Sequence, residues 1–138
     1  MTAMWRAVVF GKPGCPKCGV LRRRLESLLA ETGWDDFEPA YIDVETEDGL
    51  VAFCRAECIN PNRLPALLIM ERAPGLDSWR PVERPAPPAP EERGGSLRLY
   101  VYFGLQTDYS EAGRGVIPPE VIRSELEAVR RLRASAEG

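Results

Sequence analysis

Residues 5–19, "WRAVVFGKPGCPKCG", join a short apolar run to two cysteines that stand three positions apart. The run from Trp5 to Phe10 is rich in β-branched and aromatic residues and ends at Gly11, which predicts a buried strand. Behind the cysteines, leucines recur at helical spacing, so we expect an amphipathic helix from Pro16 to about Thr32. The stretch therefore predicts a strand, a tight turn and a helix that begins at the cysteine pair.

The rest of the chain continues this alternation of strands and helices. The segment 39–45, "PAYIDVE", alternates apolar and polar residues, which predicts a second strand. Because a helical crossover leads to it, this strand should pair with the first in parallel. Further elements are expected as a short helix capped by Thr46 and ending near 60–62, strands at 64–70 and 96–104, and a final amphipathic helix at 120–132. The expected order is βαβαββα.

A 25-residue segment with six prolines, residues 71–95, separates the third and fourth expected strands. A loop of this length inside a compact domain is uncommon and is usually functional or disordered. Its part "RPAPPAP" (84–90) favours extended polyproline II and resembles a ligand of aromatic-grooved recognition modules, although an exposed spacer is the simpler interpretation. We expect residues 1–138 to form a single domain that carries this proline-rich insert.

The composition is that of an ordinary globular protein, with 44% hydrophobic and 28% charged residues and a formal net charge of −3. We expect a cytoplasmic monomer without nucleic-acid or membrane partners, because there is no basic excess, no secretion signal and no apolar run near the about 20 residues that cross a bilayer. The chain contains no histidine, which excludes Cys-His hydrolases and histidine-containing zinc sites. Arginines 22–24 and 130, 131 and 133 are explained by solvated helix faces.

Cys15 and Cys18 form a C-x-x-C motif and are the candidate reactive centre. Cys15 would stand at the head of the helix, where free backbone N–H groups and the helix dipole lower the pKa of a thiol below its usual value of about 8.5. Lys12 and Lys17 would act in the same direction. Cys18, one turn along and further inside, should stay protonated until a mixed disulfide forms on Cys15, and then displace it. Pro16 suits the first helical turn because it lacks an N–H group.

The chain resembles the thioredoxin and glutaredoxin superfamily in four features that occur in the same order. They are the turn "FGKPGCPKC" (10–18), the βαβαββα order, the proline of "RLPALLIM" (63–70) and the terminal amphipathic helix. The resemblance implies an α/β thioredoxin-like fold with a central mixed four-stranded sheet flanked by helices. It also implies that the Leu64–Pro65 bond is cis, that Pro65 packs beside the reactive sulfur, and that Leu64 helps to bind the substrate backbone.

Within the superfamily the active-site turn is most similar to that of glutaredoxins, whose K-P-x-C-P-x-C pattern is matched by Lys12, Pro13, Cys15, Pro16 and Cys18. Two positions depart from the family. Val9 stands where thioredoxins usually have a buried aspartate, and "FGLQTDYSE" (103–111) lacks the Gly-Gly with which glutaredoxins usually hold glutathione. The resemblance implies dithiol–disulfide exchange with a protein or small-thiol disulfide, with no bound cofactor and with glutathione or a reductase as electron donor.

Cys54 and Cys58 lie four positions apart in the second expected helix and so share one face. Three interpretations stay open: both fill the core, as free cysteines commonly do; they form a second redox pair, within the geometric limits of a disulfide; or they join Cys15 and Cys18 in a four-thiolate zinc or iron–sulfur site. The alternatives to an oxidoreductase are therefore a metal or iron–sulfur protein, and a noncatalytic interaction module that uses the proline-rich insert.

Overall fold

The computed structural model describes residues 3–55, 64–72, 78–83, 98–99, 103–106 and 116–137. Within these ranges the helices and strands follow one another as β1 (Trp5–Gly11), α1 (Pro16–Leu29), β2 (Phe37–Asp43), α2 (Glu47–Arg55), β3 (Ala66–Arg72), β4 (Trp79–Pro81), β5 (Arg98–Leu99), β6 (Gly104–Gln106) and α3 (Pro119–Glu137).

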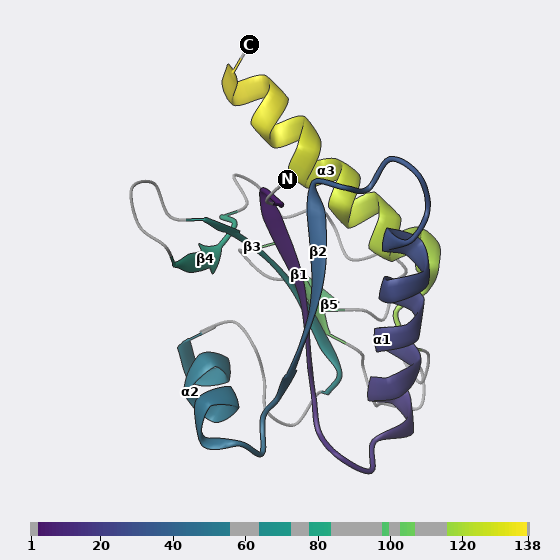
Figure 1. Cartoon of the computed structure of the whole chain (residues 1–138), viewed down its shortest axis with the longest axis vertical. Helices are drawn as coiled ribbons and strands as arrows, with labels where there is room; N and C mark the ends of the chain where they lie inside the picture. The colour runs from purple at the N-terminus through teal and green to yellow at the C-terminus, as the bar shows by residue number, and fades with distance from the viewer. Residues whose placement is uncertain are drawn as a thin grey trace.

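The strands form one mixed sheet in the order β2-β1-β3-β6-β5, and β4 pairs with β3 beside this path. Strands β1 and β2 are parallel, as the helical crossover predicts, whereas β3 runs antiparallel to both β1 and β6. Helices α1 and α3 lie together on one side of the sheet and α2 lies on the other (Figure 1). This arrangement confirms the prediction of an α/β fold with a central mixed sheet flanked by helices, consistent with a thioredoxin-like fold.

Strand β1 is buried on both of its faces, which explains its nearly continuous apolar sequence. Trp5, Ala7 and Val9 belong to the core that the sheet forms with α1 and α3. Val8 and Phe10 point the other way, into a second core that includes Phe53 of α2. Because successive side chains of a strand alternate between faces, β1 anchors both helical layers.

The sheet differs from the predicted four strands in the segment 96–104, and the prediction of a single strand there is wrong. The described residues form two short antiparallel strands, with Leu99 of β5 opposite Leu105 of β6. The strand that joins β3 is β6, which begins at Gly104, where the predicted strand ended. A side chain at Gly104 would lie 3.2 Å from the carbonyl oxygen of Leu67, so the absence of one allows this close approach to β3.

The proline-rich insert is shorter than predicted at its start, because β3 continues to Arg72. Residues 79–81, predicted as part of this loop, form β4 and extend the sheet at the far end of β3. Trp79 holds the strand in place, since the guanidinium groups of Arg6 and Arg72 lie 4.2 and 4.7 Å from its ring centroid. The polyproline segment 84–90 lies outside the described residues, and the single-domain prediction stays a prediction.

Helix α2 begins at the predicted cap. The Thr46 hydroxyl oxygen accepts a hydrogen bond from the Gly49 N–H at 3.0 Å, and the Thr46 hydroxyl donates one to the Asp43 carbonyl at 2.8 Å. Gly49 packs directly on the end of β2, because a Cβ atom there would lie 1.8 Å from the Asp43 carbonyl oxygen. The first turn of α2 is thereby fixed against the sheet.

Candidate functional site

The cysteine motif lies where β1 turns into α1. The chain leaves β1 at Gly11, passes Gly14 in a left-handed conformation with φ 72°, and enters the helix through Cys15, whose backbone is extended. Pro16 occupies the first helical position, as predicted. The Cys15 Sγ accepts a hydrogen bond from the Cys18 backbone N–H at 3.1 Å, which places this sulfur on the free N–H groups of the helix. The predicted position of Cys15 at the N-terminus of a helix is confirmed.

The two sulfurs are joined in a disulfide, with the Cα atoms of Cys15 and Cys18 5.3 Å apart. Their environments differ sharply. The Cys18 residue is 1% exposed, whereas Cys15 is partly exposed. An incoming disulfide can therefore reach Cys15 but not Cys18, and the geometry is that of one accessible thiol with a sheltered partner.

An apolar cluster forms the floor beneath this pair. Cys18 is buried with Phe10, Phe53 and Leu64, and Cys15 packs against the same cluster. A thiol in such surroundings resists ionisation, because no water solvates the thiolate. The surroundings of the pair thus have two opposing effects. The helix N-terminus favours negative charge, whereas the apolar interior opposes it.

The start of β3 lies at the same edge of the sheet as the cysteine turn. The Leu64–Pro65 peptide bond is cis, which confirms the expectation from the family resemblance. Both residues are buried, and the next residue, Ala66, pairs with Phe10 at the end of β1. The structure therefore brings Leu64 into the cluster around Cys18. The expected roles of Leu64 and Pro65 in substrate binding stay predictions.

The remaining predicted residues of the turn flank Cys15 along the chain. Lys12, Pro13 and Pro16 are exposed, and Lys17 is half-buried in the first turn of α1. The expected influence of the two lysines on the Cys15 thiol stays a prediction.

Cys54 does not fill the core, and that interpretation is wrong for this residue. It is a free, exposed cysteine of α2. The helix turns Gly49 and Phe53 toward the sheet and leaves Leu50 53% exposed, on the same side as Cys54. Cys58 lies outside the described residues, so the second redox pair stays untested. Among the described residues, no three cysteine or acidic side chains are grouped to hold a metal ion.

Sequence reasoning missed Tyr41 as a neighbour of the cysteine pair. A Cβ atom on Gly11 would lie 2.6 Å from the Tyr41 hydroxyl oxygen and 2.9 Å from the Cys18 Cβ. Burial raises the pKa of the Tyr41 phenol, the Asp43 carboxylate raises it further, and the Arg22 guanidinium opposes them. The sequence alone does not predict this neighbour, because it depends on the β1–β2 register, in which Tyr41 stands opposite Val9.

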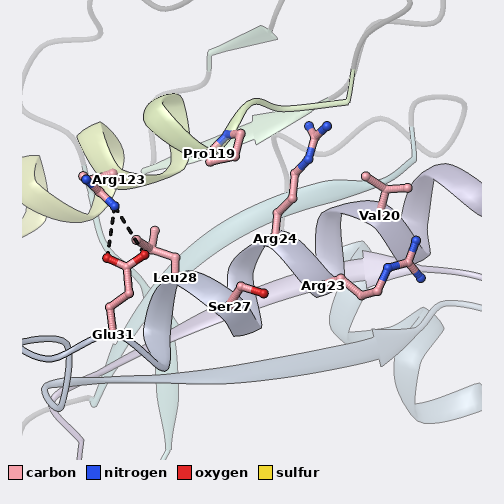
Figure 2. Close-up of a pocket in the computed structure, with 8 residues that line it drawn as sticks. All are labelled: Val20, Arg23, Arg24, Ser27, Leu28, Glu31, Pro119 and Arg123. Atoms are coloured by element: carbon pink, nitrogen blue, oxygen red, sulfur yellow. Dashed lines mark hydrogen bonds and ion pairs between the residues drawn. The ribbon is translucent and has the colours of Figure 1, made fainter.

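A groove of about 280 Å³ between α1 and α3 lies apart from the cysteines and is lined by Val20, Arg23, Arg24, Ser27, Leu28, Glu31, Pro119 and Arg123. Figure 2 shows Arg24 extending from α1 toward the chain that leads into α3. The Arg24 guanidinium donates hydrogen bonds to the carbonyl oxygens of Val116 and Ile117 at 3.1 and 3.0 Å. The interpretation as a purely solvated face is therefore wrong for Arg24, which ties the two helices together.

We expect Arg24→Met to lower the free energy of unfolding by about 1–2 kcal/mol, because two charge-assisted hydrogen bonds are lost while helical propensity is kept. Urea unfolding followed by circular dichroism measures this change. Arg23→Met is the matched control, since Arg23 is the exposed neighbour on the same helix and its replacement should change stability by less than about 0.5 kcal/mol. Equal losses in the two variants would contradict the assignment.

Comparison with known proteins gives one partial match. A glutaredoxin of Vibrio cholerae serotype O1 is 42% identical to the chain over 40 residues, which cover 29% of this chain and 44% of that glutaredoxin. The match thus spans less than half of the relative. No protein-family model matches the chain, and no solved structure matches it with statistical significance. None of the helices in the described ranges has the length and apolar character needed to cross a membrane. With its mixed sheet, its C-x-x-C at the head of α1 and this partial match, the chain resembles the thioredoxin and glutaredoxin superfamily.

Proposed function

We propose that the protein is a dithiol–disulfide oxidoreductase in which Cys15 is the nucleophile and Cys18 the resolving thiol. The observation that carries this proposal is the asymmetry of the pair. One sulfur is partly exposed on the N–H groups of a helix, and the other is buried within disulfide-bonding distance behind it. A site for exchange needs both properties, because the first thiol must meet a substrate and the second must be protected from it.

In the reductive direction, the Cys15 thiolate attacks one sulfur of a substrate disulfide. A mixed disulfide forms, and the other substrate sulfur leaves as a thiolate. Cys18, once deprotonated, attacks the Cys15 sulfur and releases the second substrate thiolate. The two cysteines lose two electrons, which the substrate gains, and the product is the Cys15–Cys18 disulfide seen in the structure. The same steps in reverse would oxidise a dithiol substrate.

The electrostatics of the turn favour the first step. The Cys18 N–H already points at the Cys15 Sγ, and the dipole of α1 adds positive potential at the same point. Lys12 and Lys17 flank this sulfur along the chain and add positive charge near it. These groups stabilise the thiolate of Cys15 and so favour its attack on a substrate disulfide at neutral pH.

The substrate proposed for this site is a disulfide of a protein or of a small thiol. We propose that Leu64 and Pro65, which directly precede β3, contact an extended substrate backbone beside Cys15. Glutathione or a reductase would return electrons to the Cys15–Cys18 disulfide. We propose a monomer that works in the cytoplasm, where such donors keep thiols reduced.

The pKa of Cys15 gives a direct test of the proposed nucleophile. In a Cys18→Ser variant, the rate of Cys15 alkylation should rise with pH and level off at a midpoint at least about one unit below the usual value near 8.5. Reaction with iodoacetamide, followed by mass spectrometry of the Cys15 peptide, measures this midpoint. The same variant in concentrated urea is the control, because unfolding removes the helix terminus and should return the midpoint to about 8.5. Equal midpoints in the folded and unfolded protein would refute the proposal.

A further inference from the structure

Tyr41 lies between the end of β1 and the first turn of α1. The space that a Gly11 side chain would fill is bounded by the Tyr41 hydroxyl oxygen at 2.6 Å and by the Cys18 Cβ at 2.9 Å. The phenol oxygen and the Cys18 Cβ can therefore be no further apart than the sum of these two distances. Gly11 leaves the room in which the two side chains approach each other.

Arg22 fixes the tyrosine ring in this position. It follows Cys18 by one helical turn, so both side chains project from the same face of α1. The Arg22 guanidinium lies 4.6 Å from the centroid of the Tyr41 ring. The ring is therefore covered by a cation from α1, and its hydroxyl oxygen and the Cys18 Cβ both border the space beside Gly11.

Among the described residues, the hydrophobic cluster around Cys18 consists of Val8 and Phe10 of β1, Phe53 of α2, Leu64 before β3, and Ala66 and Leu68 of β3. None of these side chains can stabilise a negative charge. Among the described residues, Arg22 on α1 and Asp43 on β2 act on the charge of Tyr41, and Glu26 of α1, 3.7 Å from Arg22, lines the same small pocket as the tyrosine. Asp43 carries the wrong sign to help, and its carboxylate accepts the Glu45 N–H at 2.8 Å in the turn that follows β2. A hydroxyl donor at Cys18 would therefore have a large effect.

We propose that Tyr41 is a positioning residue whose hydroxyl donates a hydrogen bond to the Cys18 thiolate when the disulfide is open. The role of this hydrogen bond in a reaction rests on the proposed oxidoreductase function. In the resolving step the Cys18 sulfur bonds to the Cys15 sulfur, and the substrate sulfur leaves with the electron pair of the broken bond. The proton that Cys18 has lost passes through the solvent to the leaving thiolate. Tyr41 keeps its own proton throughout.

The protonation state of Tyr41 agrees with this role. Burial and the nearby Asp43 carboxylate hold the pKa of the phenol above its ordinary value, against the opposing effect of Arg22. The group is thus a neutral donor at physiological pH, where a phenolate would instead repel the thiolate.

The test compares Cys15→Ser with Cys15→Ser/Tyr41→Phe and follows the ionisation of Cys18 with pH through the carbon-13 Cβ resonance of labelled cysteine, which is identified by its loss in Cys15→Ser/Cys18→Ala. This readout suits a buried thiol because no reagent has to reach it. Loss of the phenol oxygen should raise the midpoint of Cys18 ionisation by about one pH unit, which corresponds to a hydrogen bond to a charged group. An unchanged midpoint would overturn the proposal.

The matched control places Tyr41→Phe in the Cys18→Ser background, where the midpoint of Cys15 alkylation should stay the same. Structural damage at the turn would move both midpoints, and such a result would also overturn the proposal. Because neither measurement needs a substrate, the outcome is independent of the proposed function. If Tyr41→Phe raises the Cys18 midpoint but the protein shows no exchange activity, the Tyr41–Cys18 hydrogen bond stands and only its role in a reaction is refuted.

A second measurement needs no change to Tyr41. Coupling between two sites is reciprocal, so a thiolate at Cys18 should raise the pKa of the Tyr41 phenol. Carbon-13 NMR of labelled tyrosine would follow this resonance with pH in the reduced Cys15→Ser protein and in Cys15→Ser/Cys18→Ala. The phenol should titrate at lower pH once Cys18 is removed, and identical titrations would contradict the inference.

Discussion

Replacing Cys15 by serine should reduce the rate of disulfide exchange by about 1,000-fold or more, because a serine hydroxyl is not ionised at neutral pH and cannot form the mixed disulfide. The reduced protein is mixed with a disulfide-bonded peptide for a single turnover, and the released peptide thiol is measured. This design needs no electron donor, so the result does not depend on whether glutathione or a reductase serves the protein. A Cys15→Ser protein that exchanges at the wild-type rate would refute the assignment of the nucleophile.

Cys18→Ser should fail at the next step and so separates the two roles. Its Cys15 should still attack the peptide disulfide, but the mixed disulfide should accumulate, since the buried position now holds no thiol. Mass spectrometry of the intact protein detects the added peptide. Ser27→Ala is the control for the helix, because Ser27 is exposed two turns beyond the cysteines and its loss should leave both steps unchanged. Equal accumulation of the adduct in wild type and Cys18→Ser would contradict the resolving role.

Gly49→Ala should destabilise the fold by about 3 kcal/mol, because the new Cβ would lie 1.8 Å from the Asp43 carbonyl oxygen and 2.8 Å from its carbon. Backbone atoms cannot rotate out of the way, so α2 must move off the end of β2. Thermal and urea unfolding measure the loss. The displaced helix would also disturb Phe53, which closes the apolar floor under Cys18.

Gly19→Ala provides a matched control of opposite sign. Gly19 is also a helical glycine, but the contact its Cβ would make is with the Arg23 guanidinium at 3.3 Å, the flexible end of an exposed side chain. Alanine should therefore stabilise α1 by about 0.5–1 kcal/mol through its higher helix propensity. A similar effect of the two substitutions would show that helix propensity, and not the contact with β2, decides the stability at Gly49.

The strand, turn and helix around Cys15 could be predicted from sequence because the signals are local. An apolar run, a Gly-Pro turn and a leucine stripe each specify backbone structure within a few residues. The cis bond at Leu64–Pro65 was accessible only through the resemblance, since nothing in its neighbours distinguishes it from a trans bond.

The errors concern features that depend on which residues face each other. Alternation in 96–104 indicates extended backbone, but it does not reveal that the strand beside β3 begins at Gly104. The general preference of cysteine for burial failed at Cys54, because Gly49 and Phe53 set the buried face of α2. The alternation in 39–45 places Tyr41 on the polar side of its strand, and its closeness to Cys18 follows only once Gly11 is known to leave a gap.

The unequal shelter of the two thiols also bears on damage by peroxide. A peroxide that oxidises the open sulfur of Cys15 produces a sulfenic acid, and further attack would convert this group irreversibly to a sulfinic acid. The Cys18 sulfur lies within disulfide-bonding distance of Cys15, but its burial shields it from the oxidant. It can condense with the sulfenic acid, expel water and form the disulfide, which thiols can reduce again. In the proposed site, the buried cysteine would therefore allow the exposed one to be reduced again after oxidation.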